Sequence, residues 1–545
     1  MPKTGGQLIA ECLDRNQVGK VFCVPGESYL GALDALFDKK KSIKVINARH
    51  EAGASNMAES YGKLTGKPGV ALVTRGPGAC HASVGVHIAH QDSTPMILIV
   101  GDVARNVRDR EAFQEVDFKN FFGPISKWVA EINDPDRVPE YMNRAFSLAT
   151  SGRPGPVVLV TPEDMLSQIS KVQSPILSPV INGEMPSKGL SALIENLKKS
   201  KKPLFIIGGS GWTNKSCSKF HNFINENNIP VATSFRRQDL FDHKNENFAG
   251  SFGTSVSPKL IDSTKNSDLI IVLGARLGEM TTQGYSIISP QDISKNIIHI
   301  HVDPNELNKV FNANVCINVG VNECCDKLEE LTLDNSNRWK EWRNELNKNY
   351  LEDSKPQKNR NLNNLSKIFE IVEKKFPTNS IITLDAGNNA AWPQRFLSFG
   401  RNRRQIASTC GSMGYAIPAA VSSALSNPEK AVLCCVGDGG FMMSSQEIST
   451  AVHYNAKIII LLINNSSYAT IRMHQERDYP GRKIATDLKN PDFVKLCKAM
   501  GADAYRVKGV EDFSQIFVKA LKSKKVNVIE IPISINQLSH RYNLK

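Results

Sequence analysis

The sequence predicts an α/β protein made of three doubly wound domains, each with a parallel sheet between layers of helices. Short apolar runs alternate with helical patterns along the chain, which is typical of parallel strands that are buried on both faces. Two stretches interrupt this alternation and are interpreted as linkers: residues 168–188 are rich in Ser and Pro, and residues 351–364 are polar. The length of 545 residues is consistent with about three or four domains.

The first domain, residues 1–167, contains the clearest alternation. Short strands are expected at Val21–Val24, Ile43–Ile46, Val70–Thr74, Met96–Val100 and Val157–Val160. Helical patterns at Ala52–Leu64 and Ala79–Ala89 lie between them. Strands that alternate with helices in this way predict a parallel sheet with crossover helices.

The second and third domains repeat the pattern. The second domain, residues 189–350, begins with the apolar run Pro203–Gly209, and a charged helix is expected around Trp339–Tyr350. Its further expected strands are Leu269–Leu273 and Ile297–Val302. The third domain, residues 363–545, contains two buried strands, Ala431–Val436 and Lys457–Ile463.

Composition excludes several classes of protein. No window of about 18 apolar residues exists, and the first residues lack the apolar stretch of a signal peptide, so we expect no membrane span or secretion. The net charge of +13 is spread among acidic residues without a basic and aromatic strip, so no nucleic-acid partner is expected. The eleven cysteines form no C-x-x-C motif, which favours reduced thiols in a cytoplasmic protein.

One stretch carries most of the chemical information. The strand Ala431–Val436 ends in Gly437, Asp438, Gly439 and Gly440. The glycines allow the backbone to approach a ligand and leave the next helix N-terminus open to an anion. Asp438 supplies a carboxylate oxygen and Asn465, at the end of the next strand, an amide oxygen. Such oxygens suit Mg²⁺, so we expect a diphosphate held through Mg²⁺ at these strand ends.

The helix after the glycines has a predicted start of its own. Ser444 is followed three positions later by Glu447, ahead of an apolar pattern. This spacing is that of a capping box, in which the serine and the glutamate satisfy each other's backbone N–H groups. The helix is therefore expected to begin at Ser444.

Gly-Asp-Gly followed at this spacing by Asn-Asn resembles the signature of thiamine diphosphate (ThDP) enzymes. The resemblance implies that Ser467 adds its backbone carbonyl to the metal site of Asp438 and Asn465. The segment Gly411 to Gly414 resembles the one whose bulky residue, here Met413, wedges between the two cofactor rings and holds them bent. An ordinary core methionine is the alternative. Tyr468 either faces the cofactor or packs in the core.

A second group of residues is expected to activate the cofactor. ThDP needs a carboxylic acid bonded to its pyrimidine ring nitrogen, in a fairly apolar pocket. Glu51 lies at a predicted helix start in Arg-His-Glu-Ala-Gly-Ala, and the helix dipole alone also favours a glutamate there. This motif, followed by Val73–Ala79 (VTRGPGA), resembles the acetolactate synthase branch of the ThDP enzymes. Glu51 is therefore the predicted acid, and the family match places Gln114 on the substrate side.

The resemblance also implies partners and a second cofactor. In the family the glutamate comes from one subunit and the diphosphate site from its neighbour, so at least a homodimer is implied, and a homotetramer is common. Acetolactate synthases bind FAD in the middle domain, and Arg276 and Asp303 match flavin-contacting pieces. Related lyases keep a Gly-Ala-Arg without flavin, so this motif leaves FAD binding open.

Two departures leave the reaction open. The arginine that binds the carboxylate of the acceptor 2-oxo acid in acetolactate synthases is replaced by Met280, which cannot donate a hydrogen bond. The Gln-Trp-Glu that helps to choose the acceptor is replaced by the stretch Arg472–Glu476, in which Arg472 or His474 is a candidate substitute. One hypothesis is an acetolactate synthase-like enzyme acting on pyruvate or a similar 2-oxo acid. The alternatives are a ThDP-dependent decarboxylase or C–C lyase on another carbonyl substrate, and a non-catalytic subunit.

Overall fold

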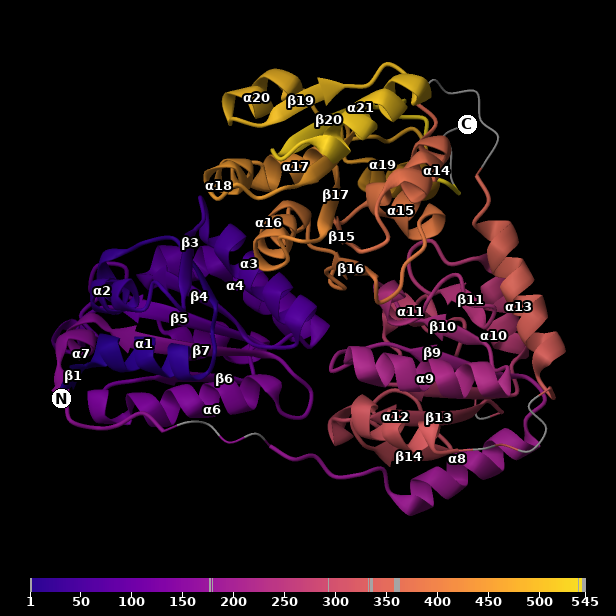
Figure 1. The fold of residues 1–545 in the computed structure, drawn as a ribbon, viewed down its shortest axis with the longest axis horizontal. Coiled ribbons are helices and arrows are strands. Elements are labelled where there is room, and N and C mark those ends of the chain that lie inside the picture. The colour runs from indigo at the N-terminus through magenta and orange to yellow at the C-terminus, as the bar shows by residue number, and fades with distance from the viewer. Residues whose placement is uncertain are drawn as a thin grey trace.

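The computed structural model describes residues 2–175, 178, 180–292, 294–331, 333, 337–356, 363–537 and 539–541. Three domains each contain a six-stranded, wholly parallel sheet with helices on its faces (Figure 1). The predicted fold class is confirmed. The first expected linker, 168–188, includes a short strand, Ile169–Ser170, and the first two residues of the helix Ser187–Lys199, and residues 176, 177 and 179 lie outside the described residues. The second expected linker, 351–364, lies partly outside the described residues.

The first domain contains the predicted strands and helices with small shifts at their ends. Its strands are β2 (Lys20–Cys23), β3 (Lys44–Asn47), β4 (Gly69–Thr74), β5 (Met96–Asp102), β6 (Trp128–Glu131) and β7 (Pro156–Pro162). Its helices are α1 (Gly5–Arg15), α2 (Leu30–Asp38), α3 (Glu51–Thr65), α4 (Arg75–Asp92), α5 (Phe118–Phe122), α6 (Val138–Thr150) and α7 (Glu163–Ser167). The short strands β1 (Lys3–Thr4) and β8 (Ile169–Ser170) pair antiparallel beside it.

The second domain has strands β9 (Pro203–Ile207), β10 (Val231–Thr233), β11 (Phe248–Ser251), β12 (Leu269–Leu273), β13 (Asn296–His301) and β14 (Val315–Asn318). Its helices are α8 (Ser187–Lys199), α9 (Asn214–Asn227), α10 (Pro258–Asn266), α11 (Glu279–Thr282), α12 (Val321–Glu329) and α13 (Lys340–Asp353). The spatial order is β11-β10-β9-β12-β13-β14, so the strand order reverses between β9 and β12. Ligands of open α/β sheets bind outside the strand ends at such a point.

The third domain has strands β15 (Ser380–Leu384), β16 (Arg403–Ala407), β17 (Ala431–Gly437), β18 (Ile459–Asn464), β19 (Asp503–Arg506) and β20 (Asn527–Pro532). Its helices are α14 (Leu365–Lys375), α15 (Ala391–Phe396), α16 (Ala416–Ser426), α17 (Asp438–Ser444), α18 (Glu447–His453), α19 (Ala469–Asp478), α20 (Phe493–Ala499) and α21 (Val510–Lys522). The order β16-β15-β17-β18-β20-β19 corresponds strand by strand to β3-β2-β4-β5-β7-β6 of the first domain. The order reverses at β15/β17 and at β2/β4.

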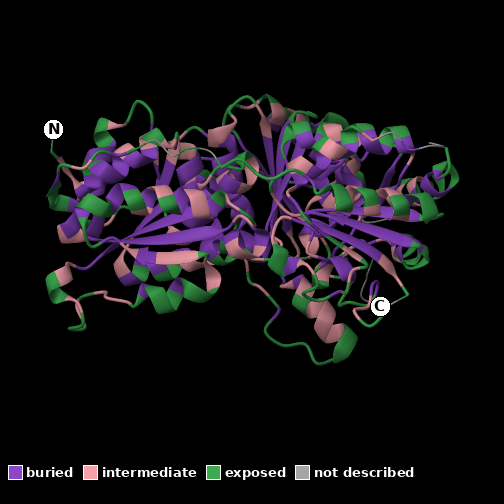
Figure 2. Ribbon diagram, turned by 90° about the horizontal axis from the view of Figure 1, so that it is seen from below, coloured by how far each residue is buried: buried purple, intermediate pink, exposed green. Residues whose placement is uncertain are grey.

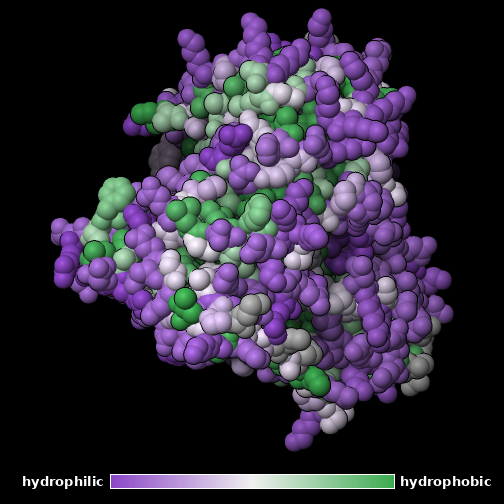
Figure 3. All heavy atoms as spheres, turned by 60° about the vertical axis from the view of Figure 1, so that its left-hand side comes forward, coloured by the Kyte–Doolittle hydropathy of each residue, from purple (hydrophilic) through white to green (hydrophobic). Residues whose placement is uncertain are grey.

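The sheets are the buried centres of the domains (Figure 2). Strands β5 and β7 are buried along their whole lengths, which explains why their sequences are continuously apolar. All eleven cysteines are free thiols, and most of them are buried. Among the described residues, no helix is long and apolar enough to cross a membrane. The face in Figure 3 is mostly hydrophilic, but hydrophobic side chains gather across its middle.

The first and third domains share one hydrophobic core, where α3 packs against α16. Buried charges lie within this interface. Lys63 on α3 is paired with Glu59 at 3.1 Å and with Asp92, and Tyr415 donates a 2.5 Å hydrogen bond to Glu59. Asp92 in turn accepts the backbone N–H of Thr409 in the third domain at 2.9 Å. The buried charges of this cluster are thus paired with one another, and the cluster links the first domain to the third.

The helix predicted to begin at Ser444 begins earlier. Helix α17 starts at Asp438, directly after β17, and Ser444 is its last residue. Glu447 starts the next helix, α18, but its carboxylate accepts the backbone N–H groups of Arg49 and His50 in the first domain. The capping-box prediction is therefore wrong, because donors from another domain take the place of those in the local helix.

Candidate active site

The Gly-Asp-Gly segment lies at the point where the strand order of the third sheet reverses. Asp438 begins α17 and is 3% exposed. Burial raises the pKa of its carboxyl, and hydrogen bonds, first among them that of Asn490, oppose the rise. The Asn490 amide donates to Asp438 Oδ2 at 2.7 Å and to Asn464 Oδ1 at 3.0 Å. One amide thus holds the ends of β17 and β18 together, with a buried carboxylate between them.

The loop after β18 brings the other predicted metal ligands to the same edge. Asn465 Oδ1 accepts the backbone N–H of Ser467 at 3.2 Å, which closes a tight turn. Ser466, inside this turn, has a left-handed backbone with φ of +53°, and its backbone N–H group contributes to lowering the pKa of Asp438. Ser467 is 4% exposed and donates its hydroxyl to the carbonyl of Thr486 at 2.8 Å. The carboxylate, amide and carbonyl oxygens that Mg²⁺ requires therefore occur on two adjacent strand ends.

The glycines of this segment make room for close neighbours. A Cβ on Gly439 would lie 2.5 Å from the Tyr468 ring and 3.3 Å from Met413 Cε. A Cβ on Gly440 would lie 2.3 Å from Asp385 Oδ2. Gly439, Met413 and Tyr468, which were singled out separately in the sequence, thus form one group. The side chain of Met413 is partly open, with 37% of its surface exposed.

Two residues that sequence reasoning missed support this group. Asp385, at the end of β15, accepts the backbone N–H groups of Gly414 at 3.1 Å and Tyr415 at 3.3 Å. Burial raises the pKa of Asp385 to about 6. The amide oxygen of Asn389 accepts a hydrogen bond from the N–H of Gly437 at 2.9 Å. Both residues follow the strand beside β17, and their position at the reversal of strand order is the signal that could have revealed them.

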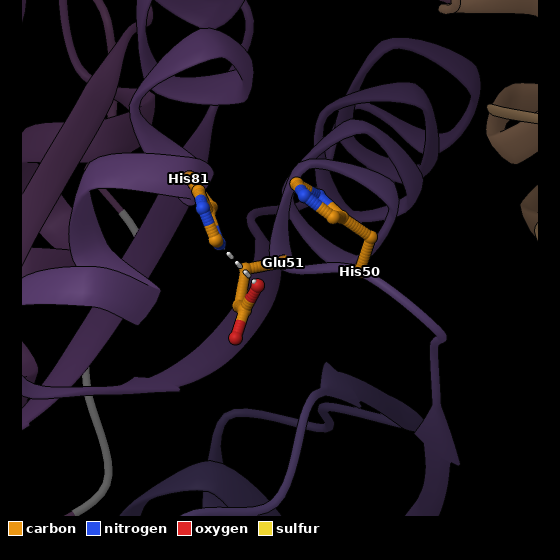
Figure 4. Close-up of side chains that lie close together, drawn as sticks. All are labelled: His50, Glu51 and His81. Carbon is orange, nitrogen blue, oxygen red and sulfur yellow. Dashed lines mark hydrogen bonds and ion pairs between the residues drawn. The ribbon is translucent and has the colours of Figure 1, made fainter. Parts of the chain in front are cut away.

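Glu51 is the first residue of α3, as the sequence predicts. His50 caps the helix, because its Nδ1 accepts the N–H of Ala52 at 3.1 Å. The carboxylate of Glu51 is 15% exposed and bonds to Nδ1 of His81 on α4 at 2.9 Å. Figure 4 shows these two side chains pointing toward one another, with His50 beside them. A Cβ on Gly78 would lie 3.6 Å from Glu51 Oε1, so the backbone of this glycine lies beside the carboxylate.

The cluster of His50, Glu51 and His81 has metal-ligating residue types but does not fit a metal. The N–H of Ala52 donates to His50 Nδ1, so the proton of the neutral ring lies on Nε2. A metal would need the lone pair that Ala52 already occupies. The arrangement instead gives Glu51 Oε2 a donor from His81 and leaves the carboxylate 15% exposed, which suits a carboxylate that exchanges a proton with a ligand.

Gln114 lies close to the start of α4. Its backbone carbonyl accepts the N–H of Gly76 at 2.9 Å, and its own backbone is left-handed with φ of +67°. Gly76 begins the same helix as Gly78, which faces Glu51. The turn that carries Gln114 is therefore anchored beside the glutamate. The predicted residues fall into two groups, one around Glu51 in the first domain and one around Asp438 in the third.

A cavity of about 1220 Å³ lies between the three domains, at the strand reversal of the second. Gly209, after β9, and Gly274, after β12, line it back to back; a Cβ on Gly209 would lie 1.9 Å from the Gly274 carbonyl oxygen. Arg276 also lines it and donates to the carbonyl of Gln91 in the first domain. The carboxylate of Asp303 accepts hydrogen bonds from the backbone N–H and the side-chain amide of Asn305, each at 3.0 Å, and caps a short turn.

Comparison with known proteins agrees with this geometry. Residues 3–121 match the thiamine pyrophosphate enzyme N-terminal TPP binding domain, 190–328 its central domain and 385–531 its C-terminal TPP binding domain. The acetolactate synthase large subunit of Buchnera aphidicola from Schizaphis graminum is 30% identical over 99% of this chain and 96% of its own length. The chain belongs to the thiamine pyrophosphate enzyme family.

Other relatives of this thiamine pyrophosphate (ThDP) enzyme carry similar names. The mitochondrial acetolactate synthase of Schizosaccharomyces pombe is 29% identical over 99% of this chain and 84% of its own length. The acetolactate synthase isozyme 3 large subunit of Escherichia coli is 27% identical, with 99% and 96% covered. The chain is thus a ThDP-dependent enzyme that resembles the catalytic subunits of acetolactate synthases.

The residues that depart from the acetolactate synthase pattern are placed as follows in this ThDP enzyme. Met280 is on α11 and lines the large cavity. Arg472 is on α19, where its guanidinium bonds to Glu476 at 2.7 Å and approaches Asp487 at 3.7 Å. His474 is half-buried on the same helix. The positive charge of Arg472 is therefore already balanced by neighbouring carboxylates.

Proposed function

We propose that this enzyme uses ThDP and Mg²⁺ to cleave a carbon–carbon bond next to the carbonyl of a 2-oxo acid and to join the fragment to a second carbonyl compound, as acetolactate synthases do. The main support is the assembly of Asp438, the Asn465–Ser467 turn, Gly439, Met413 and Tyr468 at one strand reversal. The names of the relatives agree with this reaction.

The metal would be held by Asp438, by the amide oxygen of Asn465 and by the backbone carbonyl of Ser467. All three are hard oxygen donors, as Mg²⁺ prefers, and the buried Asp438 gains most from a cation because burial penalises its charge. The N-terminus of α17, lined by Gly437, Gly439 and Gly440, would receive the diphosphate.

Glu51 would exchange a proton with the pyrimidine ring nitrogen of the cofactor in the neighbouring subunit. When bound, ThDP supplies a nucleophilic thiazolium carbon. Gly78 leaves room for the ring beside Glu51, and His81 Nδ1 orients the carboxylate from its other side. Gln114 would face the substrate from the turn that closes on Gly76. The hydrophobic surface in Figure 3 and the exposed side chains of Met442 and Met443 on α17 support a homodimer at least, and a homotetramer is consistent with the family.

A second candidate function is a decarboxylase or C–C lyase on another carbonyl substrate. Two observations favour it. Met280 has no hydrogen bond to offer where acetolactate synthases use arginine, and Arg472 is engaged by Glu476 rather than free to hold a carboxylate. In this case the fragment would be protonated rather than joined to an acceptor acid.

The large cavity is our candidate site for FAD. It lies at the strand reversal of the second sheet, where dinucleotides bind in such folds. Arg276, which lines it, would face the diphosphate, and Gly209 and Gly274 allow close approach of the backbone. Purified protein with a flavin absorption spectrum that is lost in Arg276→Met would support this assignment. Protein that stays colourless after incubation with FAD would contradict it.

The function is tested by incubating the enzyme with ThDP, Mg²⁺ and pyruvate and identifying the products by NMR. Acetolactate is the expected product. Acetaldehyde would move the assignment to the decarboxylase. If neither acetolactate nor acetaldehyde forms, both reactions of pyruvate are contradicted. The assignment would then be a lyase that acts on another carbonyl substrate. In each case Asp438→Ala should lose Mg²⁺-dependent ThDP binding, and unchanged affinity would contradict the proposed metal site.

A further inference from the structure

The contact between Glu447 and the turn before Glu51 has no part in the chemistry described so far. Glu447 begins α18, just after the helix that carries Asp438, and its side chain is completely buried. Its Oε1 accepts the backbone N–H groups of Arg49 and His50, both at 3.1 Å, and Oε2 accepts the hydroxyl of Thr450 at 2.7 Å. In Figure 1, α18 lies beside β3, the strand that leads into this turn.

The bonded N–H groups have a particular place in the chain. His50 is the residue that caps α3, and Arg49 precedes it, so both donors lie directly before Glu51. A helix N-terminus leaves such donors without partners inside the helix and favours a negative charge nearby. Glu447 therefore supplies, from another domain, a hydrogen-bond acceptor for the backbone at the start of α3.

The close fit continues one turn into the helix. A Cβ on Gly53 would lie 2.3 Å from Glu447 Oε1, so even alanine has no room there while the contact is made. This explains the glycine in Arg-His-Glu-Ala-Gly-Ala, which the proposed chemistry does not use. Glu447 thus contacts the chain on both sides of Glu51, at the N–H groups of Arg49 and His50 before it and at Gly53 after it.

From these contacts we infer that Glu447 is a positioning residue, which holds the backbone before Glu51 so that the Glu51 carboxylate faces the cofactor of the neighbouring subunit. The inference rests on the proposed function of Glu51. Glu447 starts the helix that directly follows the one beginning with Asp438. Each chain would therefore align the acid of one active site with the same β17–α17–α18 segment that forms the metal site of the other.

The charged and polar groups around Glu447 agree with such a role. Burial raises the pKa of its carboxyl to about 7, while Thr450, the two backbone N–H groups and the charge of Arg49 act in the opposite direction. The first domain faces it with the Arg49 guanidinium and two amides, and its own helix with the Thr450 hydroxyl. An acceptor is required at Oε1 in either protonation state, since both N–H groups point there.

The test compares variants by hydrogen–deuterium exchange at the ThDP C2 carbon, with Mg²⁺-dependent ThDP affinity measured beside it. In Glu447→Ala the two amides lose their acceptor, so exchange should slow about 10- to 100-fold while ThDP affinity stays near the parental value. Glu447→Gln keeps an amide oxygen for both N–H groups and should restore exchange close to the parental rate. Gly53→Ala, which pushes the Glu447 side chain away, should resemble Glu447→Ala.

Ser422→Ala is the matched control. Its hydroxyl donates to the carbonyl of Met57 in the middle of α3 at 2.8 Å, so it removes a contact between the same two domains away from Glu51. It should exchange at the parental rate. Parental exchange in Glu447→Ala would overturn the inference, as would equal slowing in Ser422→Ala. If Glu447→Ala does not fold, Gly53→Ala decides in the same way.

Glu51→Gln separates this inference from the proposed function. If Glu51→Gln exchanges as fast as the parent, the proposed role of Glu51 fails and the inference fails with it. If Glu51→Gln is slow and Glu447→Ala is fast, the proposed function stands and only the positioning role is wrong.

Discussion

Replacing Glu447 by glutamine should make the protein more stable above neutral pH, although the side chain lies beside the proposed catalytic acid. The carboxyl is completely buried, and its pKa rises from 4.5 to about 7 mainly because burial disfavours the charge. A rise of this size corresponds to about 3 kcal/mol of stability that depends on pH.

The sign follows from the raised pKa. The native state binds the proton more tightly than the unfolded state, so the contribution to stability is fully present below pH 4.5 and is lost as the pH rises through about 7. Glutamine stays neutral throughout, so Glu447→Gln should equal the parent in acid. It should exceed the parent by up to about 3 kcal/mol at about pH 8.

Thermal unfolding of parent and variant across this pH range measures the effect. At about 2–4 °C per kcal/mol for domains of this size, the difference in Tm should grow with pH to about 6–12 °C. Glu370→Gln is the control, since Glu370 is exposed and pairs with Lys374 on the surface, where an ion pair contributes little, so its Tm should stay close to the parental value. A Glu447→Gln protein that is less stable than the parent at about pH 8, or a difference independent of pH, would refute the reasoning.

Three further predictions concern the site and the domain interface. Asn490→Ala removes the amide that donates to Asp438 Oδ2 and Asn464 Oδ1, so Mg²⁺-dependent ThDP binding should weaken about 10- to 100-fold. Titration calorimetry measures the affinity, and an unchanged value would contradict the role of Asn490. Gly439→Ala places a Cβ 2.5 Å from the Tyr468 ring and should also weaken ThDP binding. The control is Gly19→Ala, which has open space around its Cβ and should bind ThDP as the parent does; equal ThDP affinities of the two variants would contradict the close packing at Gly439. Lys63→Met leaves Glu59 and Asp92 buried without their cation and should lower the free energy of unfolding, measured by urea denaturation, by about 3–5 kcal/mol. A loss below about 1 kcal/mol would show that the three charges do not depend on one another.

The sequence predicted the parts of the fold that depend on local pattern. Strand β12 has the predicted ends, Leu269 and Leu273, because a short, continuous apolar run is typical of a strand that is buried on both faces of a parallel sheet. Short strands such as β10, Val231–Thr233, were missed because three residues show no periodicity. Loops at the strand ends carry the recognisable glycines, so Gly439 and Asp438 were found from the sequence.

Contacts between distant segments could not be predicted in this way. Asn490 reaches the Gly-Asp-Gly segment from a loop that has no pattern of its own. The clearest failure is Glu447, whose spacing from Ser444 favours a local capping box. Its carboxylate instead satisfies two amides of the first domain, and a local pattern contains no information about those donors.

The central claim is that Glu51 of one subunit serves the cofactor held by Asp438 of its neighbour. It is tested most directly by mixing Glu51→Gln and Asp438→Ala chains, dissociating them and allowing them to reassociate. If the site is shared between subunits, each mixed dimer contains one intact site, and random pairing should restore about a quarter of the parental rate of C2 exchange. If both groups act within one chain, every site in the mixture keeps one substitution, and exchange no faster than in the separate variants would contradict the account.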